Sequence, residues 1–376
     1  MFSQVLLLIG TFLLPLSATS DETPSARVRF PLHGDTLRTG EQIYRDACAA
    51  CHGADGSGNL PELIVFEAPV PDFTDCNFAT READSDWFAV VHDGGPARGF
   101  SRMMPAFGDA LTDEEIRRVV AYLRTFCDDP EWPRGELNLP RPIITEKAFP
   151  EDEAVYTTAP SLERPFVWEH ELVFEKRFGA LNQWEVVVPF TVAKRANDDW
   201  TGGVGDVAVG VKRVMYHNLD RGRIVSAAIE AILPTGDEDD GFGSGTLRFE
   251  PFVSAGQLLP GDGFLQFQVG AELPTDRDRA NEEGFWRGAI GRTFTENRFG
   301  RTWSPMIEVL GRREFASGEH ALWDVLPQVQ VSLNTRQHVL ANVGVLVPIN
   351  RTRDRPVQLW FYLLWDTFDG PFFAGW

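Results

Sequence analysis

Residues 48–52 read Cys48-Ala49-Ala50-Cys51-His52, and this stretch decides how the amino-terminal part of the chain folds. In a Cys-x-x-Cys-His motif the two thiols add across the vinyl groups of a haem, and the histidine lies under the iron as an axial ligand. A structural zinc site needs four ligands, and the sequence has no second cysteine or histidine cluster. The motif therefore predicts one covalent haem c, with Cys48 and Cys51 as attachment points and His52 as an iron ligand.

The second axial ligand is expected downstream, in the stretch Ser101-Arg102-Met103-Met104-Pro105-Ala106-Phe107-Gly108. A thioether is a common partner of histidine on haem iron, and Met104 is far enough from His52 for the chain to wrap the haem and return on its other face. Met103 is the alternative ligand. A further alternative is that both methionines only pack in a core.

Residues 33–127 carry helical signals. Residues 41–47 predict a short helix that ends in the cysteine motif. Thr112 and Glu115 form the pattern of a capping box, and apolar residues then recur on one face through Phe126. Long loops separate these helices, so a domain with this little regular structure needs a large group at its centre, which a haem supplies.

In order along the chain, these elements resemble a class I cytochrome c domain, which implies an all-α fold for residues 33–127. The resemblance covers about a quarter of the chain. It implies that Gly40 and Tyr44 cross the last helix near Tyr122, and that the Pro61 carbonyl orients the His52 imidazole. In the family the methionine before proline is the axial ligand, which selects Met104.

Residues 164–376 have a different pattern, in which segments of about ten to fourteen residues alternate apolar and polar side chains. One segment sets Leu265, Phe267 and Val269 against Gln266 and Gln268. We expect an antiparallel β-barrel of about 10–12 strands, because the segments suit tilted membrane strands of about 9–11 residues better than the shorter strands of soluble sheets. A soluble barrel or sandwich is the alternative.

Three further features favour an outer-membrane barrel. Aromatic residues lie near segment ends, as in interface girdles, and the chain ends on Trp376, which resembles the carboxy-terminal assembly signal of outer-membrane proteins. The polar faces carry charges and amides, as a watery lumen would. The aromatic residues are Trp184, Trp200, Phe264, Trp286, Trp303, Trp323 and Trp360.

Residues 202–212, Gly-Gly-Val-Gly-Asp-Val-Ala-Val-Gly-Val-Lys, resemble a motif of small outer-membrane barrels in the phenol-degradation transporter-like group. A Gly-rich turn that enters a strand explains part of the same pattern.

The remaining segments predict export and a tether. Residues 1–20 have the apolar run and small residues of a signal peptide, although an uncleaved anchor helix is the alternative. Residues 128–163 contain six prolines and predict an extended, solvated linker. In an oxidising compartment Cys76 and Cys127 pair or stay as two buried thiols, and the sequence leaves both open.

The formal net charge of −20 argues against nucleic acid as a partner, because nothing in this balance neutralises phosphates. An acidic surface suits a basic redox partner protein, and a small redox mediator is also compatible. Lipid of the outer membrane is the partner expected for the barrel.

With both axial positions filled, the iron has no open site for substrate, so the sequence predicts an electron carrier more readily than an enzyme. The favoured hypothesis is one-electron transfer by a haem with His/Met ligation, in a periplasmic domain tethered to the bacterial outer membrane. Two alternatives remain: an outer-membrane channel or transporter with an accessory cytochrome module, and a soluble periplasmic cytochrome with a β binding domain.

Overall fold

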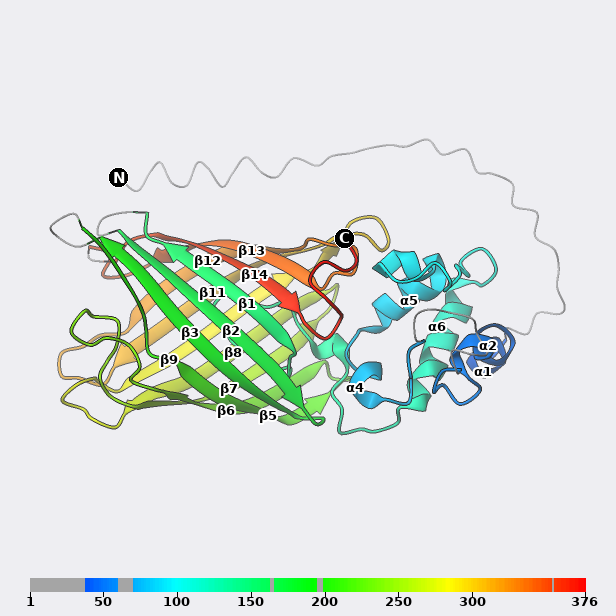
Figure 1. The fold of residues 1–376 in the computed structure, drawn as a ribbon, viewed down its shortest axis with the longest axis horizontal. Helices are drawn as coiled ribbons and strands as arrows, with labels where there is room; N and C mark the ends of the chain where they lie inside the picture. Colours follow the sequence, from blue (N-terminus) through cyan, green and yellow to red (C-terminus); the bar gives the residue numbers. More distant parts are fainter. Residues whose placement is uncertain (1–37, 60–69, 163–165, 195–198, 354) are drawn as a thin grey trace. The chain divides into compact units, whose positions relative to one another are not determined.

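The computed structural model describes residues 38–59, 70–162, 166–194, 199–353 and 355–376. The expected signal peptide and Pro61 lie outside these residues. Within them a small helical domain precedes a closed antiparallel barrel, which confirms the architecture expected from the sequence (Figure 1). No helix among the described residues combines the length and the apolar character that a membrane crossing requires.

The helical domain is built from short elements joined by loops. The first turns follow one another without a break, as α1, η1 and α2, and the longest helices are α5 and α6. The elements are α1 (Gly40–Ile43), η1 (Tyr44–Cys48), α2 (Ala49–His52), α4 (Cys76–Ala79), α5 (Asp84–Asp93), η2 (Gly95–Arg98), α6 (Asp113–Leu123) and η3 (Arg124–Phe126), with η4 (Gly135–Leu137) following the domain.

Helix α6 begins as the sequence predicts. The Glu115 amide donates to the Thr112 hydroxyl oxygen at 3.3 Å, and the Thr112 amide donates to the Glu115 carboxylate at 3.0 Å. Its apolar face, which includes Ile116 and Val120, is buried in the core of the domain.

The crossing between the first and last helices is also confirmed. A Cβ at Gly40 would overlap the backbone carbonyl of Arg118 on α6, so only glycine permits this approach. The Tyr44 ring packs 5.5 Å from Tyr122 and 5.1 Å from Phe126, measured between ring centroids. The Tyr44 hydroxyl donates to the Gly53 carbonyl at 2.6 Å, which ties this crossing to the end of the cysteine motif.

Cys76 and Cys127 form a disulfide between α4 and the residue that follows η3. The bond closes a loop whose ends are 51 residues apart. The sequence left open whether these cysteines pair or stay as two buried thiols, and in the structure they are paired.

The barrel consists of strands of 8 to 13 residues, apart from the short strands β4 and β10. Among the described residues twelve strands form the ring, which closes because β1 pairs with β14; β4 lies beside β3 and β10 beside β11. The strands are β1 (Glu153–Pro160), β2 (Val167–Phe178), β3 (Asn182–Lys194), β4 (Trp200–Val204), β5 (Ala208–Asn218), β6 (Arg223–Ile232), β7 (Arg248–Leu259), β8 (Gly263–Pro274), β9 (Glu283–Arg292), β10 (Phe294–Thr295), β11 (Thr302–Glu314), β12 (Leu322–Ser332), β13 (Val339–Pro348) and β14 (Gln358–Asp366).

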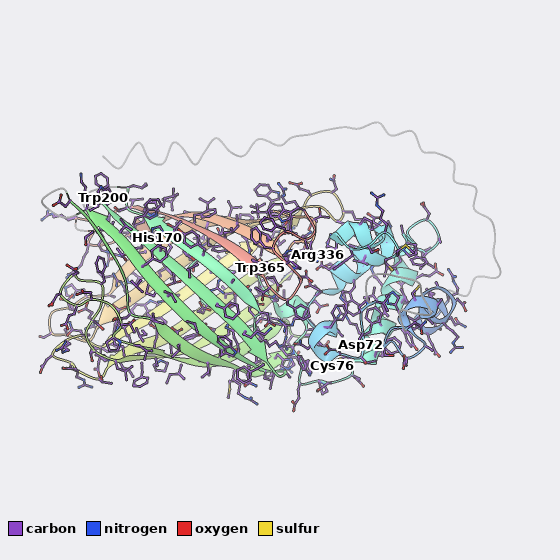
Figure 2. The ribbon with its side chains drawn as sticks, in the orientation of Figure 1. Asp72, Cys76, His170, Trp200, Arg336 and Trp365 are labelled. Carbon is purple, nitrogen blue, oxygen red and sulfur yellow. A yellow bond between two sulfur atoms is a disulfide. The ribbon has the colours of Figure 1, made fainter. Side chains whose placement is uncertain are left out.

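Alternation along the strands places apolar side chains outside and polar side chains inside. On β8, Leu265 and Phe267 are 43% and 45% exposed, whereas Gln266 and Gln268 are 2% and 0% exposed. This is the reverse of a soluble protein, in which the buried face is the apolar one. Figure 2 labels Trp200 and Trp365, which lie near opposite ends of the barrel.

Two expectations about aromatic residues are wrong. Phe264 and Trp360 do not belong to an outer girdle: Phe264 is 1% exposed and packs with Leu139 and Met306, and Trp360 lines a cavity inside the barrel. The last strand ends at Asp366, so Trp376 does not close it. The period-two pattern assigns a face to each residue but cannot show where a strand ends.

The expected solvated linker is also corrected. Residues 153–160 form β1 and complete the barrel wall, so the barrel begins before residue 164. The preceding stretch is buried, with Leu139 at 5%, Thr145 at 2% and Phe149 at 1% exposure. The reason is that this segment lies inside the barrel and supplies partners for its polar inner face. We call residues 138–152 the lumen segment.

Candidate haem site and the barrel lumen

The cysteine motif begins in a π-helical turn. In η1 the Ala49 amide bonds to the Tyr44 carbonyl, five residues back, and α2 then carries Cys51 and His52. Asn59 holds the end of the motif, since its side-chain amide donates to the Ala50 carbonyl at 2.7 Å and its backbone amide to the Cys51 carbonyl at 3.0 Å. Single π-helical turns are frequent at functional sites.

Cys48 and Cys51 are both free thiols, whereas the other two cysteines are paired. Burial, followed by the neighbouring Cys51, raises the pKa of the Cys48 thiol to about 11. A thiol of this kind stays protonated at neutral pH, which is unlike the depressed pKa of redox-active or nucleophilic cysteines.

His52 lies against aromatic side chains. Its ring lies 5.0 Å from Phe73, which in turn lies 5.3 Å from Trp87. Burial lowers the pKa of His52, so the neutral imidazole that binds iron is favoured. Its Nδ1 is buried without a hydrogen-bond partner among the described residues, and the expected acceptor, the Pro61 carbonyl, lies outside them.

The two candidate methionines differ in their surroundings. Met104 is partly buried and packs against the apolar core formed by residues such as Ile43, Trp87 and Val91. Met103 is 57% exposed. The Gly95 amide donates to the Met104 carbonyl at 3.0 Å and fixes the loop at this point. This packing favours Met104 as the thioether that faces a haem.

The donor set in this domain fits a haem. The Cys48 thiol and the partly buried Met104 thioether pack against one apolar cluster, and the half-buried His52 ring lies against Phe73 of that cluster. The second free thiol, Cys51, precedes His52 in α2. Apolar side chains around these groups suit a porphyrin, and the four donors match the chemistry of covalent attachment and two-sided axial ligation.

In the barrel, the lumen segment is held by side chains of the wall. Glu308 on β11 is fully buried, and its carboxylate accepts from the backbone amides of Ile143 at 3.1 Å and Thr145 at 2.7 Å, and from the Ile144 amide between them. Successive amides that converge on one carboxylate form an anion-binding arrangement. Glu308 therefore fixes the tip of the segment.

Other strands bond to the rest of the segment. Side chains of these strands form hydrogen bonds with the backbone amides and carbonyls of the segment. Buried backbone groups need such partners, and an extended chain does not supply them itself. Gln266 donates to the Pro140 carbonyl at 2.7 Å, Tyr362 to the Arg141 carbonyl at 2.8 Å, Lys212 to the Lys147 carbonyl at 3.0 Å, and Gln183 accepts from the Glu151 amide at 2.7 Å.

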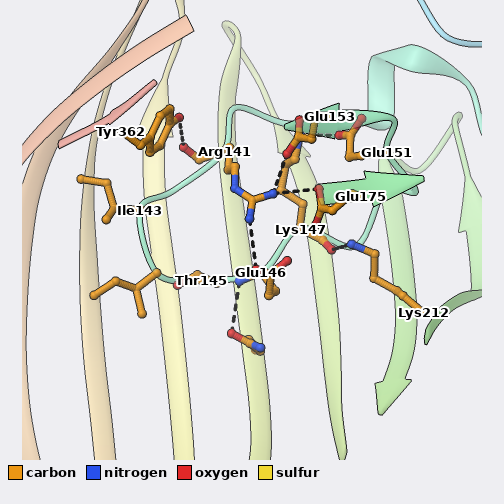
Figure 3. A network of polar contacts seen from close by, with 12 residues as sticks. Arg141, Ile143, Thr145, Glu146, Lys147, Glu151, Glu153, Glu175, Lys212 and Tyr362 are labelled. Carbon is orange, nitrogen blue, oxygen red and sulfur yellow. Dashed lines mark hydrogen bonds and ion pairs between the residues drawn. The ribbon is translucent and has the colours of Figure 1, made fainter. Parts of the chain in front are cut away.

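Arg141 is the centre of a buried charge network in the lumen (Figure 3). Its guanidinium pairs with Glu153 at 2.5 Å, Glu175 at 3.0 Å and Glu146 at 3.2 Å. A buried guanidinium needs partners of this kind, because an unpaired charge inside a protein is costly. The expected watery lumen is thus filled at this level by the chain itself.

A hollow remains beside the tip of the lumen segment. This cavity of about 400 Å³ is lined by Ile144 of the segment and by wall residues that include Glu169, Arg312, Asp324 and Trp360.

The sequence reasoning missed the lumen segment. The prolines of residues 128–163 are typical of a linker. The sequence does contain a signal for burial, because large apolar residues are uncommon in a solvated linker. They are Leu139, Ile143, Ile144 and Phe149.

Comparison with known proteins assigns the helical domain. Residues 35–123 match the family model of "Cytochrome C oxidase, cbb3-type, subunit III". A gluconate 2-dehydrogenase cytochrome c subunit of Pantoea cypripedii is 34% identical over 96 residues, which are 24% of this chain and 20% of that protein. The chloroplastic cytochrome c6 of Chlamydomonas reinhardtii is 29% identical, and the chain spans 58% of its length.

The barrel is similar to solved outer-membrane structures at low identity. An outer-membrane channel from Pseudomonas putida F1 is 11% identical with a TM-score of 0.44, covering 60% of this chain and 99% of that one. The KdgM porin is 12% identical with a TM-score of 0.38, covering 57% of this chain and 98% of that one.

Cytochrome c6 of Bryopsis maxima is 31% identical over 90 residues, which are 24% of this chain and 91% of that protein. Through residues 35–123, this chain belongs to the cytochrome c family.

Proposed function

We propose that this protein is a monohaem electron carrier anchored in the bacterial outer membrane. Cys48 and Cys51 hold one haem c covalently, and His52 and Met104 are its axial ligands. The observation that carries the proposal is that the Cys48 thiol and the Met104 thioether pack against one apolar core, and that the half-buried His52 ring lies against Phe73 of the same core. A haem held in this way supplies reversible one-electron chemistry, and thioether ligation raises its reduction potential.

The membrane anchor is supported by the exterior of the barrel. Strands of 10 to 13 residues match the length needed for a tilted membrane crossing, and their outward side chains are apolar. On β13, Val343, Val345 and Val347 are 36–43% exposed in one row. A soluble protein rarely leaves a band of this kind open to water.

The ends of the strands support a periplasmic haem domain. Tight turns, at residues 179–181, 219–222 and 260–262, lie at the end where β1 begins and β14 finishes. Longer connections, such as 233–247, lie at the other end. Outer-membrane barrels have short periplasmic turns and long external loops. The helical domain precedes β1, whose first residue lies at the short-turn end of the barrel.

The acidic charge of the chain favours a basic redox protein or a small redox mediator as the electron partner, and charge complementarity would act mainly on the rate of encounter. With His52 and Met104 both bound to the iron, neither axial position is open to a substrate. This favours an electron carrier over an enzyme.

A gated channel with an accessory cytochrome is the second candidate. The observation that favours it is the cavity of about 400 Å³ beside the lumen segment. The hydrogen bonds between Glu308 and three successive amides oppose it, because they hold the segment inside the barrel.

The test uses the full-length protein extracted from membranes. We expect detergent to be required for extraction, one haem per chain that resists acidic acetone, and a reversible one-electron titration. The variant with Cys48→Ala and Cys51→Ala should lose covalent haem yet remain in the outer-membrane fraction. Release of the protein by alkali alone would contradict the anchor, and haem removed by acidic acetone would contradict covalent attachment.

A further inference from the structure

Three carboxylates converge inside the barrel, well apart from the haem donors in the sequence. Glu146 lies on the lumen segment, Glu175 on β2 and Glu185 on β3, and in the strand register Glu175 faces Glu185. One carboxylate oxygen from each of the three lies within 4.8 Å of the other two. The two wall residues are deeply buried, at 0% and 3% exposure.

Each of the three carboxylates keeps an oxygen without a partner. Arg141 pairs with Oε1 of Glu146 and with Oε2 of Glu175. The opposite oxygens, Oε2 of Glu146 and Oε1 of Glu175, are buried and have no hydrogen-bond partner among the described residues, and the same holds for Oε1 of Glu185. A buried carboxylate oxygen with no donor destabilises the folded protein, because its lost hydration is not replaced. We therefore expect these oxygens to bind a ligand.

The charges around them do not balance. Five carboxylates and three cations make up this buried network, a formal excess of two negative charges. Two of the cations have other partners than the three carboxylates. Lys147 pairs with Glu151 and Glu153, and Lys212 donates to the Lys147 carbonyl at 3.0 Å. The network comprises Glu146, Glu151, Glu153, Glu175, Glu185, Arg141, Lys147 and Lys212.

We propose that Glu146, Glu175 and Glu185 bind one hard divalent cation of the Ca²⁺, Mg²⁺ and Mn²⁺ class. An all-oxygen donor set selects these ions over the softer metals that prefer imidazole or thiolate. The cation neutralises the two excess charges and fills the unpartnered oxygens. Because Glu146 belongs to the lumen segment and the other two to the wall, the ion also fastens the segment to β2 and β3.

The experiment is a Mn²⁺ titration of the full-length holoprotein in detergent, after dialysis against a chelator. The loss of the electron paramagnetic resonance signal of free Mn²⁺ counts the bound ion. We expect one saturable site per chain, from which Ca²⁺ displaces Mn²⁺. Glu185→Gln keeps the shape of the side chain and should weaken binding by about tenfold or more, because one charged ligand is lost; Glu146→Gln should act in the same direction.

The matched control is Glu250→Gln, a half-buried carboxylate on the inner face of β7 outside the three. Its Mn²⁺ affinity should equal that of the unmodified protein; an equal loss in both would mean a diffuse charge effect and overturn the site. Folded protein without saturable Mn²⁺ binding would also overturn it. The Cys48→Ala and Cys51→Ala variant should bind Mn²⁺ normally, and a loss there would place the ion at the haem domain and overturn the assignment.

Discussion

Met103 and Met104 are neighbours in the chain with opposite environments. Met104 packs against the core of the helical domain, and Met103 is more than half exposed. The physical reason is local: the Gly95 amide holds the Met104 carbonyl, and a Cβ at Gly95 would lie 3.3 Å from the Met104 Cβ, so this loop turns one side chain inward. Substitution of Met104 therefore has a matched control in substitution of Met103.

We expect Met104→Ala to abolish the weak near-infrared band of a ferric iron–methionine bond. It should also lower the reduction potential by on the order of 0.1 V or more, within the range of about 0.8 V that axial ligands set. Absorption spectroscopy and potentiometry of the purified protein check this. Met103→Ala is the control and should keep both properties; if the control alone loses the band, Met103 is the ligand.

Gly40→Val should destabilise the helical domain by about 1–3 kcal/mol, because the new side chain overlaps the Arg118 carbonyl where α1 crosses α6. Guanidinium unfolding followed through the haem absorption measures the change. Ala47→Val introduces the same side chain at an exposed position of η1 and should leave the midpoint close to that of the unmodified protein. Equal midpoints for the Gly40 and Ala47 variants would refute the close crossing.

At the scale of elements, the disulfide between α4 and the end of η3 closes the helical domain on itself. We expect Cys76→Ser with Cys127→Ser to lower the stability of that domain by about 2–4 kcal/mol, mainly through the freer unfolded chain. The same unfolding measurement tests it, and the single-residue variants should lose as much stability as the double one. An unchanged midpoint would show that the bond contributes nothing.

We expect the lumen segment to limit conduction through the barrel, because wall side chains such as Glu308 hold it inside. Glu308→Ala leaves three backbone amides without their acceptor, at a cost of about 1–3 kcal/mol for each buried donor. We expect this variant to loosen the segment and raise single-channel conductance in planar bilayers, with Glu308→Gln intermediate because one acceptor oxygen remains. Glu314→Gln, at the exposed end of the same strand, should conduct like the unmodified protein. If Glu308→Ala does not raise conductance, the segment does not control the pore.

At the scale of the whole molecule, the barrel has two different ends. Short turns and both chain termini of the barrel lie at one end, and most of the longer loops at the other. In the proposed orientation, intact cells carrying Asp239→Cys, in the 233–247 loop, should react with a membrane-impermeant maleimide. Cells carrying Asp220→Cys, in the 219–222 turn, should react only after the outer membrane is opened. The reverse labelling would place the haem domain outside the cell.

The sequence by itself determined the two-part architecture and the haem chemistry. A five-residue motif specifies covalent attachment through local spacing alone, and Thr112 with Glu115 marks a helix start through neighbouring residues. Strand alternation likewise assigns inside and outside without any tertiary contact, so the barrel and its approximate strand number followed from pattern. Each of these signals is carried by residues close together in the chain.

Only the tertiary structure decided what fills the barrel. Whether residues 138–152 are solvated or buried depends on partners far along the chain, such as Glu308 and Tyr362, and no local pattern encodes those contacts. The same is true of the Cys76–Cys127 pairing and of the inward turn of Phe264. Ring closure between β1 and β14 is the physical reason, because it brings residues from across the sequence around one polar interior that the chain itself must satisfy.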